Sequence, residues 1–395
     1  MSGSELHQLH RTSRGVRRGA ALTLLFAGVL GTAAATGVLP YGEEETPRVH
    51  TRPVASTADR DEVARAAADA MANGKSGTEA AEEVVSRSGD RWGSVYDKSE
   101  YEEFQQALDG SYTGVGLWAR RTADGLVEVT RVHPGGPAQQ AGIGPGDIIR
   151  DIDGRGIRKL PVTDVMALLR GEGKSDGVSV VGTTVVLGLE REGHRWTESL
   201  RRARLTTESV TVDTIEGGVL RIEVDAFTKG TGQRVRDAVR AAPKGTGVLL
   251  DLRGNAGGLV AEAVTAASAF LDGGLVATYD IRGEQRALYA DPGGDTDRPL
   301  VVLVDGGTMS AAELLTGALQ DRGRSVTVGS RTFGKGSVQM PSTLPDGSVA
   351  ELTVGTYRTP AGHGVDGRGV TPDLPVSEGA QERATSVLGG LGSAE

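Results

Sequence analysis

Two short runs made almost wholly of apolar residues limit the folds open to this chain more than any other feature. They lie at 248–252 and 300–304, and each leads through a glycine-rich turn into a segment with helical periodicity, at 259–271 and 311–322. A strand covered on both faces is apolar at nearly every position, whereas a half-exposed strand alternates. Strands that alternate with helices predict an α/β core at 206–375. The other elements expected there are strands at 219–224 and 325–329 and a helix at 232–241.

The segment before this core has a different pattern. Between 110 and 205, short β-type runs are separated by glycine turns, and the helix expected at 163–170 carries Val165 and Leu169 on its apolar face. This pattern predicts a compact β-rich domain. The stretch 171–182 is rich in Gly and Ser and has no clear period, so we expect a surface loop there.

A small helical unit is expected at 59–109. Ser76 with Glu79, and Ser99 with Glu102, have the spacing of capping boxes that begin helices. The apolar positions of the first and third helices are Val63, Ala66, Ala67, Ala70 and Met71, and Tyr101, Phe104 and Leu108. We expect a linker at 40–58 and a flexible Gly/Ser/Ala-rich tail at 376–395. The fold class is therefore α+β multidomain.

The N-terminus carries an apolar run at 19–39 without a charged residue, directly after a basic segment at 1–18. This run is about as long as the ~20 residues that a spanning helix needs. Two interpretations stay open: a single-pass membrane anchor with its basic flank in the cytoplasm, or a signal peptide cleaved near Ala33–Ala35. Both predict that the rest of the chain lies outside the cytoplasm.

Composition excludes several kinds of chemistry. The net charge of −9 leaves no basic stripe for nucleic acid, and the chain has no cysteine. The six histidines are scattered and form no metal-ligand spacing, so we expect no metal site and no cofactor. The reacting groups must come from Ser, Thr, Lys or carboxylate side chains.

Ser310 stands where the apolar run 300–304 passes through a glycine turn into a helix. The amide of Ala311 falls in the first helical turn, where backbone donors are unpaired and negative charge is favoured. A serine nucleophile here would have an oxyanion donor beside it. The alternative is structural, because Ser310 with Glu313 also has capping-box spacing.

Lys335 lies between two glycines in a segment of extended pattern, where the two-residue period sets Lys335, Ser337 and Gln339 on one face. A lysine acts as a general base only when neutral, which requires burial to lower its pKa by roughly 3 units. Gln339 is an uncharged partner that can orient the amine. The alternative is an exposed lysine in a glycine turn.

A third glycine-rich turn, at Gly257 and Gly258, also follows an apolar run and opens a helix. Glycines there let backbone N–H groups approach a ligand closely. A tight structural turn or a phosphate site would have the same sequence pattern, although the lysine of a P-loop is missing.

The three segments together resemble the C-terminal processing, or tail-specific, proteases. The resemblance rests on DLRGNAGG at 251–258, SAAE at 310–313 and TFGKGSVQ at 332–339, and it extends over about 63–375. It implies a ClpP/crotonase-like core and a serine endopeptidase with Ser310 as nucleophile, Lys335 as base and Gln339 as its partner. It also implies an oxyanion hole at Gly257 and Ala311.

The β-rich domain resembles a bacterial PDZ module in Gly114-Val115-Gly116-Leu117 and in GGPAQQAGIGPGDIIRDIDG. Such a module captures an apolar C-terminal tail by strand addition. The predicted groove and pocket residues are Gly114, Val115, Gly116, Leu117, Val165 and Leu169. Core packing is the alternative for about half of the apolar ones.

The chain departs from the family pattern near the nucleophile, where Asp305 replaces a common Asn and Thr308-Met309 replaces small residues. The expected partners are proteins or peptides with apolar C-termini and, through the N-terminus, a membrane. Two rivals stay open: a non-catalytic PDZ-containing scaffold on the same fold, and a protease gated by its PDZ domain.

Overall fold

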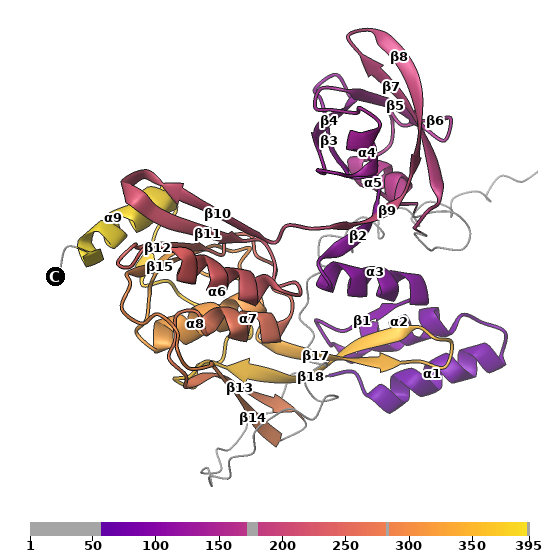
Figure 1. Cartoon of the computed structure of the whole chain (residues 1–395). Coiled ribbons are helices and arrows are strands. Elements are labelled where there is room, and N and C mark those ends of the chain that lie inside the picture. The colour runs from indigo at the N-terminus through magenta and orange to yellow at the C-terminus, as the bar shows by residue number, and fades with distance from the viewer. Residues whose placement is uncertain (1–56, 172–180, 282–283, 393–395) are drawn as a thin grey trace, which may run out of the picture. The chain divides into compact units, whose positions relative to one another are not determined.

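The computed structural model describes residues 57–171, 181–281 and 284–392 (Figure 1). The predicted basic segment, the apolar run 19–39, nearly all of the linker and most of the loop 171–182 lie outside these residues. The described chain forms two compact units, one of residues 113–205 and one of residues 57–112 together with 206–392. Within the described residues, no helix is long and apolar enough to cross a membrane.

The larger unit is built on a six-stranded sheet in the order β10-β11-β12-β15-β16-β19. All neighbours from β11 onward run parallel, and β10 is antiparallel to β11. The strands are β10 Val210–Ile215, β11 Val219–Val224, β12 Val248–Asp251, β15 Leu300–Val304, β16 Val326–Gly329 and β19 Leu374–Pro375. The predicted alternation of strands and helices is confirmed.

Helices cover both faces of this sheet, which explains the unbroken apolar strands. In β15, Leu300, Val302 and Val304 pack in the cluster formed with α6, α7 and α8, while Val301 and Leu303 face α9. Each β15 side chain is at most 1% exposed. The helices are α6 Thr231–Ala241, α7 Val260–Ala267, α8 Ala311–Asp321 and α9 Ala380–Gly392, and a 3-10 turn occupies Glu216–Gly218.

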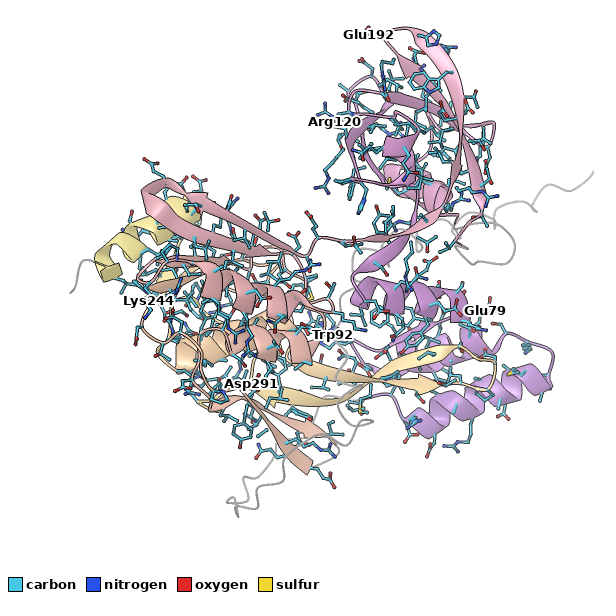
Figure 2. All side chains as sticks on the ribbon, in the orientation of Figure 1. Glu79, Trp92, Arg120, Glu192, Lys244 and Asp291 are labelled. Carbon is cyan, nitrogen blue, oxygen red and sulfur yellow. The ribbon has the colours of Figure 1, made fainter. Side chains whose placement is uncertain are left out.

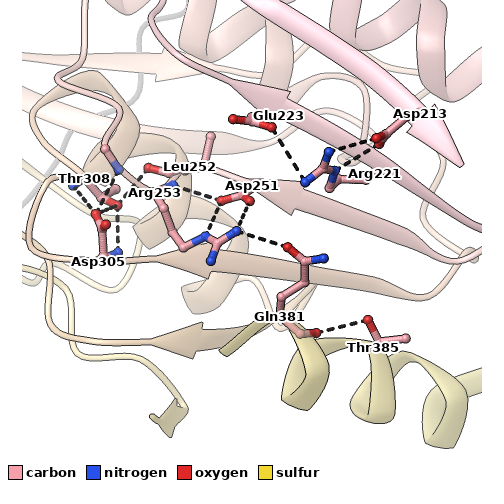
Figure 3. Close-up of polar contacts among 11 residues, drawn as sticks. Asp213, Arg221, Glu223, Asp251, Leu252, Arg253, Asp305, Thr308, Gln381 and Thr385 are labelled. Carbon is pink, nitrogen blue, oxygen red and sulfur yellow. Dashed lines mark hydrogen bonds and ion pairs between the residues drawn. The ribbon is translucent and has the colours of Figure 1, made fainter. Parts of the chain in front are cut away.

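The prediction of a flexible tail at 376–395 is wrong for the residues of α9. Ala384 and Leu388 lie one helical turn apart and are buried against the sheet. Arg253 at the end of β12 also donates to Gln381 of α9, as Figure 3 shows. The glycine and serine content predicted disorder, but the two apolar residues on one face of the helix cover one face of the sheet.

A second, antiparallel sheet joins the N-terminal helices to the rest of the larger unit. Its order is β1-β18-β13-β14, and β17 also pairs with β18. Apolar residues of α1 and α2 pack on Leu344, Ala350 and Leu352, so these two helices share a core with the segment 344–352. The elements are α1 Arg60–Ala72, α2 Gly77–Ser88, β1 Ser94–Tyr96, α3 Lys98–Leu108, β13 Leu275–Ile281, β14 Glu284–Tyr289, β17 Ser337–Thr343 and β18 Val349–Arg358.

The helix starts agree with the sequence in one case and correct it in another. Ser76 accepts from the amide of Glu79 and begins α2 as predicted. For α3 the predicted pair Ser99 and Glu102 is wrong, because Asp97 and Glu100 form the capping box. Asp97 is as good a cap as serine and stands two residues earlier.

The smaller unit is a β-rich domain whose sheet has the order β3-β4-β5-β7-β8, with β6 beside β5. Its single core contains Val129, Ile149 and Leu187. The elements are β3 Leu117–Arg121, β4 Val127–Val132, α4 Pro137–Gln140, β5 Ile148–Ile152, β6 Arg155–Gly156, α5 Val162–Arg170, β7 Thr184–Arg191 and β8 His194–Arg201. A two-stranded sheet pairs β2 Ser111–Gly114 with β9 Ala203–Thr206.

Candidate active site

The turn that carries Ser310 connects the buried strand β15 to helix α8. Ser310 has φ of 54° and ψ of −116°, a conformation that non-glycine residues rarely adopt, and it is 3% exposed. Strained residues of this kind cluster at functional sites. The amide of Ala311 makes no hydrogen bond among the described residues, so it is available as a donor beside the serine.

Asp305 and Thr308 hold the turn that carries Ser310 against the neighbouring glycine turn. Asp305 Oδ1 accepts from the amides of Gly307 and Gly254, at 2.8 and 2.9 Å. Thr308 Oγ1 donates to the carbonyl oxygen of Leu252 at 2.8 Å, as drawn in Figure 3. Two of the three positions at which this sequence departs from the family pattern, Asp305 and Thr308, therefore stabilise the turn.

Glu313 links the turn that carries Ser310 to the segment that carries Lys335. Its carboxylate accepts from the amides of Ser310, Gly334 and Lys335 at 2.9, 2.7 and 2.8 Å, and from the hydroxyl of Thr332. The side chain is 0% exposed, and burial raises its pKa even though the four hydrogen bonds oppose that shift. Glu313 thus takes part in the capping box of α8, as its spacing from Ser310 predicts, and it also links α8 to residues 334–335, which no local pattern predicts.

Lys335 is buried, so the alternative of an exposed surface lysine is wrong. The side chain is 1% exposed, and burial lowers its pKa to about 8. Nearby carboxylates oppose this shift, first Glu351, then Asp90, Glu313 and Asp366. A lysine with such a pKa is substantially neutral in mildly alkaline solution, which a general base requires.

Gln339 lies on the predicted face, since its Nε2 donates to Ser337 Oγ at 2.7 Å. Nε2 also donates to Thr353 Oγ1 at 3.2 Å, and Oε1 has no partner among the described residues. Within the described part of the chain, Lys335 Nζ makes no hydrogen bond to Ser310 Oγ or to Gln339. Catalytic hydrogen bonds often tighten only when substrate binds.

The glycine turn lies directly against the serine. A Cβ atom added at Gly257, whose φ is 96°, would stand 2.9 Å from Ser310 Cβ and 3.2 Å from Ala311 N. The N–H of Gly257, however, donates to Asn255 Oδ1 at 2.8 Å, and Asn255 Nδ2 donates to the carbonyl oxygen of Val224. Of the two predicted oxyanion donors, the N–H of Ala311 is available. The N–H of Gly257 must first leave Asn255 Oδ1 before it can donate to an oxyanion.

Tyr357 is a site residue that the sequence did not reveal. Its buried hydroxyl lies 3.0 Å from the carbonyl oxygen of Ser310 and 3.3 Å from that of Lys335. Burial raises its pKa well above the usual value, so it remains a donor. An isolated tyrosine in an extended run gives no sequence signal for such a contact.

The predicted PDZ residues lie in the core of the smaller unit. Val115, Leu117, Val165 and Leu169 are each at most 4% exposed and pack in one cluster, while Gly114 and Gly116 lie at the end of β2 and in the turn after it. A surface hollow of about 620 Å³ on this unit is lined elsewhere, by residues including Pro137, Val181 and Leu205. The predicted set does not line this hollow.

A strained serine on a strand-to-helix turn, a buried lysine tied to it and a separate β-rich domain define a chain of the serine-peptidase type. Residues 218–376 match Peptidase family S41, and residues 128–176 match the PDZ domain. Residues 218–376 therefore form a peptidase domain of family S41, and the chain as a whole is similar to C-terminal processing proteases.

Curated relatives carry the same type of name. The chain is 30% identical to the carboxy-terminal processing protease CtpA of Bacillus subtilis over 290 residues, which cover 72% of this chain and 60% of that protein. It is 30% identical over 312 residues to a probable CtpA-like serine protease of Staphylococcus saprophyticus, covering 78% and 62%. The chain therefore spans about three fifths of the length of these relatives.

Among solved structures, a photosystem II D1 C-terminal processing protease is 30% identical to this chain. The match covers 80% of this chain and 86% of that one, with a TM-score of 0.49.

Proposed function

We propose that this chain is a serine endopeptidase that uses Ser310 as nucleophile and Lys335 as general base. The observation that carries the proposal is the buried Lys335, with a pKa lowered to about 8, on a segment joined through Glu313 to the strained serine turn. A purely structural capping serine needs neither the strain nor a buried amine on the adjoining segment.

The reaction would be acyl transfer. Neutral Lys335 takes the proton of Ser310 Oγ, which attacks the peptide carbonyl carbon, and the amide of Ala311 donates to the developing oxyanion. The C–N bond then breaks as the lysine ammonium gives its proton to the leaving amine. Water, deprotonated by Lys335, attacks the resulting ester, releases the new C-terminal acid and restores the serine.

The substrates would be proteins or peptides whose apolar C-terminal tails bind the PDZ domain. Because the predicted groove residues are buried, tail binding would require strand addition at an edge that opens. We also propose that tail binding activates cleavage. A peptide with an apolar C-terminus should accelerate cleavage of a second, fluorogenic peptide, and the same peptide with a C-terminal amide should not.

The location of the enzyme would be outside the cytoplasm, with residues 19–39 as a membrane anchor or a cleaved signal. This proposal rests on the apolar run and its basic flank. The mass of the mature protein distinguishes the two forms, because a cleaved signal removes the run and an anchor retains it. A mature full-length chain that washes off membranes in salt would contradict the anchor.

The activity is tested with a fluorophosphonate probe and with peptide cleavage by the full chain. Ser310→Ala should abolish probe labelling, and Lys335→Ala should reduce both readouts by at least about 10³-fold, within the range that base removal costs in comparable sites. Folding is checked by the thermal transition. Residual cleavage within tenfold of the unmodified chain in both variants would refute the assignment.

A further inference from the structure

The loop between α2 and β1 reaches the active site from the N-terminal helices, far in sequence from the segments that match the peptidase family. Its Asp90 carboxylate accepts from Thr353 N through Oδ2 at 2.9 Å and from Thr353 Oγ1 through Oδ1 at 2.7 Å, across 263 positions of sequence. Oδ1 also accepts from the amides of Trp92 and Gly93 at 3.1 and 2.9 Å. Asp90 therefore holds its own loop and strand β18 at once.

These bonds set the direction of the hydrogen bond to Gln339. A threonine hydroxyl has one proton, and Thr353 gives its proton to Asp90, so toward Gln339 it can only accept. Gln339 Nε2 donates one hydrogen to Thr353 Oγ1 and the other to Ser337 Oγ. Both amide hydrogens are used, and Oε1 remains as the acceptor without a partner among the described residues. A neutral group in place of the Asp90 carboxylate would let the hydroxyl turn and the amide flip.

The same loop brings an aromatic ring to the lysine. Trp92, labelled in Figure 2, has its ring centroid 5.1 Å from Lys335 Nζ, and the ring also contacts Phe333 at 5.7 Å. The backbone of Trp92 is fixed by Asp90. The ring excludes water from one side of the amine, which contributes to the burial that Lys335 experiences.

We propose that Asp90 is a positioning residue of the active site: through Thr353 it orients the amide of Gln339, so that Oε1 is available to the Lys335 ammonium. This inference rests on the proposed function of Lys335 as base. Asp90 touches no reacting atom. The charged groups that face Lys335 are Asp90, Glu313, Glu351 and Asp366, so a change at Thr353 alters the hydrogen bonding without altering this set of charges.

Thr353→Val is the sharpest test, since it keeps the shape of the side chain and removes only the hydroxyl. Thr353→Ser restores the hydroxyl, and Ser342→Ala is the matched control. Ser342 accepts a hydrogen bond from Arg60, so its loss weakens the contact between the N-terminal helices and β17 without reaching Gln339. Fluorophosphonate acylation of the full chain is followed from pH 6 to 10, with the maximal rate separated from probe affinity.

We expect Thr353→Val to lower the maximal acylation rate about tenfold or more, with probe affinity unchanged, because the base is misoriented. The rising limb of its pH profile should move to lower pH, because an acceptor of the ammonium is lost. Thr353→Ser and Ser342→Ala should stay within about threefold of the unmodified chain. Equal losses in Thr353→Val and Ser342→Ala, or an unmoved limb, would overturn the proposal.

A second readout separates this inference from the proposed activity. The ¹³Cε resonance of Lys335, assigned by its absence in Lys335→Arg, reports the protonation of the amine even if no acylation occurs. The midpoint in Thr353→Val should be lower by about half a pKa unit, because a turned amide no longer offers Oε1 to the charged form of Lys335. If the unmodified chain is not acylated but this shift is found, the peptidase proposal fails and the positioning role stands. Identical Lys335 midpoints in Thr353→Val and in the unmodified chain would refute the positioning role.

Discussion

Replacement of Glu351 by glutamine should change how the stability of the larger unit depends on pH. Glu351 lies on β18 between β1 and β17 and is 4% exposed, and neither carboxylate oxygen has a hydrogen-bond partner among the described residues. Burial raises its pKa from the ordinary 4.5 to about 7, although the positive charge of Lys335 opposes the shift. The folded protein therefore keeps a proton that the unfolded chain has already released.

The sign follows from proton linkage. Between pH 4.5 and 7 the folded state binds one more proton at Glu351 than the unfolded state, so the free energy of unfolding falls as pH rises. Each pKa unit corresponds to about 1.4 kcal/mol, which gives a loss on the order of 3 kcal/mol across the interval. Glu351→Gln carries no titrating proton, so its advantage over the unmodified chain should grow by this amount toward pH 7.5. Lys335 is mostly charged between pH 4.5 and 7, below its pKa of about 8, so it adds little to the slope over that interval.

Calorimetry of the full chain at steps from pH 4.5 to 7.5 measures the effect. The difference in transition temperature between Glu351→Gln and the unmodified chain should be about 6 °C larger at pH 7.5 than at pH 4.5. This figure takes about 2 °C per kcal/mol for a unit of this size. Glu216→Gln, at an exposed site on the same unit, is the control and should show no widening gap. A constant difference between Glu351→Gln and the unmodified chain at every pH would refute the burial of this carboxyl. The same replacement should also move the rising limb of the pH profile to lower pH, since Glu351 raises the pKa of Lys335.

Four further outcomes are expected. The acylation rate of the unmodified chain should rise with pH through about 8, the pKa of Lys335, and a limb near 6.5 in stopped-flow probe kinetics would point to another base. Tyr357→Phe removes one of the two donors to the carbonyl oxygen of Ser310, while the amide of Leu314 remains, and should cost about 0.5 to 1.5 kcal/mol in chemical denaturation. Gly257→Ala places a Cβ 2.9 Å from Ser310 Cβ, so peptide cleavage should fall at least about tenfold while the PDZ unit keeps its thermal transition. Leu388→Ala removes a side chain that is 3% exposed in α9 and should destabilise the larger unit by about 2 kcal/mol in urea, whereas a flexible tail would show no change.

Near the nucleophile, local pattern was sufficient to find the residues. The apolar run before Ser310, the helix after it and the two-residue period that joins Ser337 to Gln339 are set by interactions between near neighbours. The same kind of pattern failed at Asp97, where two equally good caps compete within one turn, and at α9, where composition masked two apolar residues at helical spacing.

The sequence by itself predicted the alternation of strands and helices at the centre of the larger unit, the β-rich smaller unit and the candidate set of Ser310, Lys335 and Gln339. Only the tertiary structure decided that Lys335 is buried, that Glu313 joins its segment to the serine and that Asp90 and Trp92 reach the site from the N-terminal helices. The physical reason is range. Turns and periodicity depend on a few adjacent residues, whereas burial, the pKa of a lysine and the direction of a hydroxyl depend on groups that folding brings together across hundreds of positions.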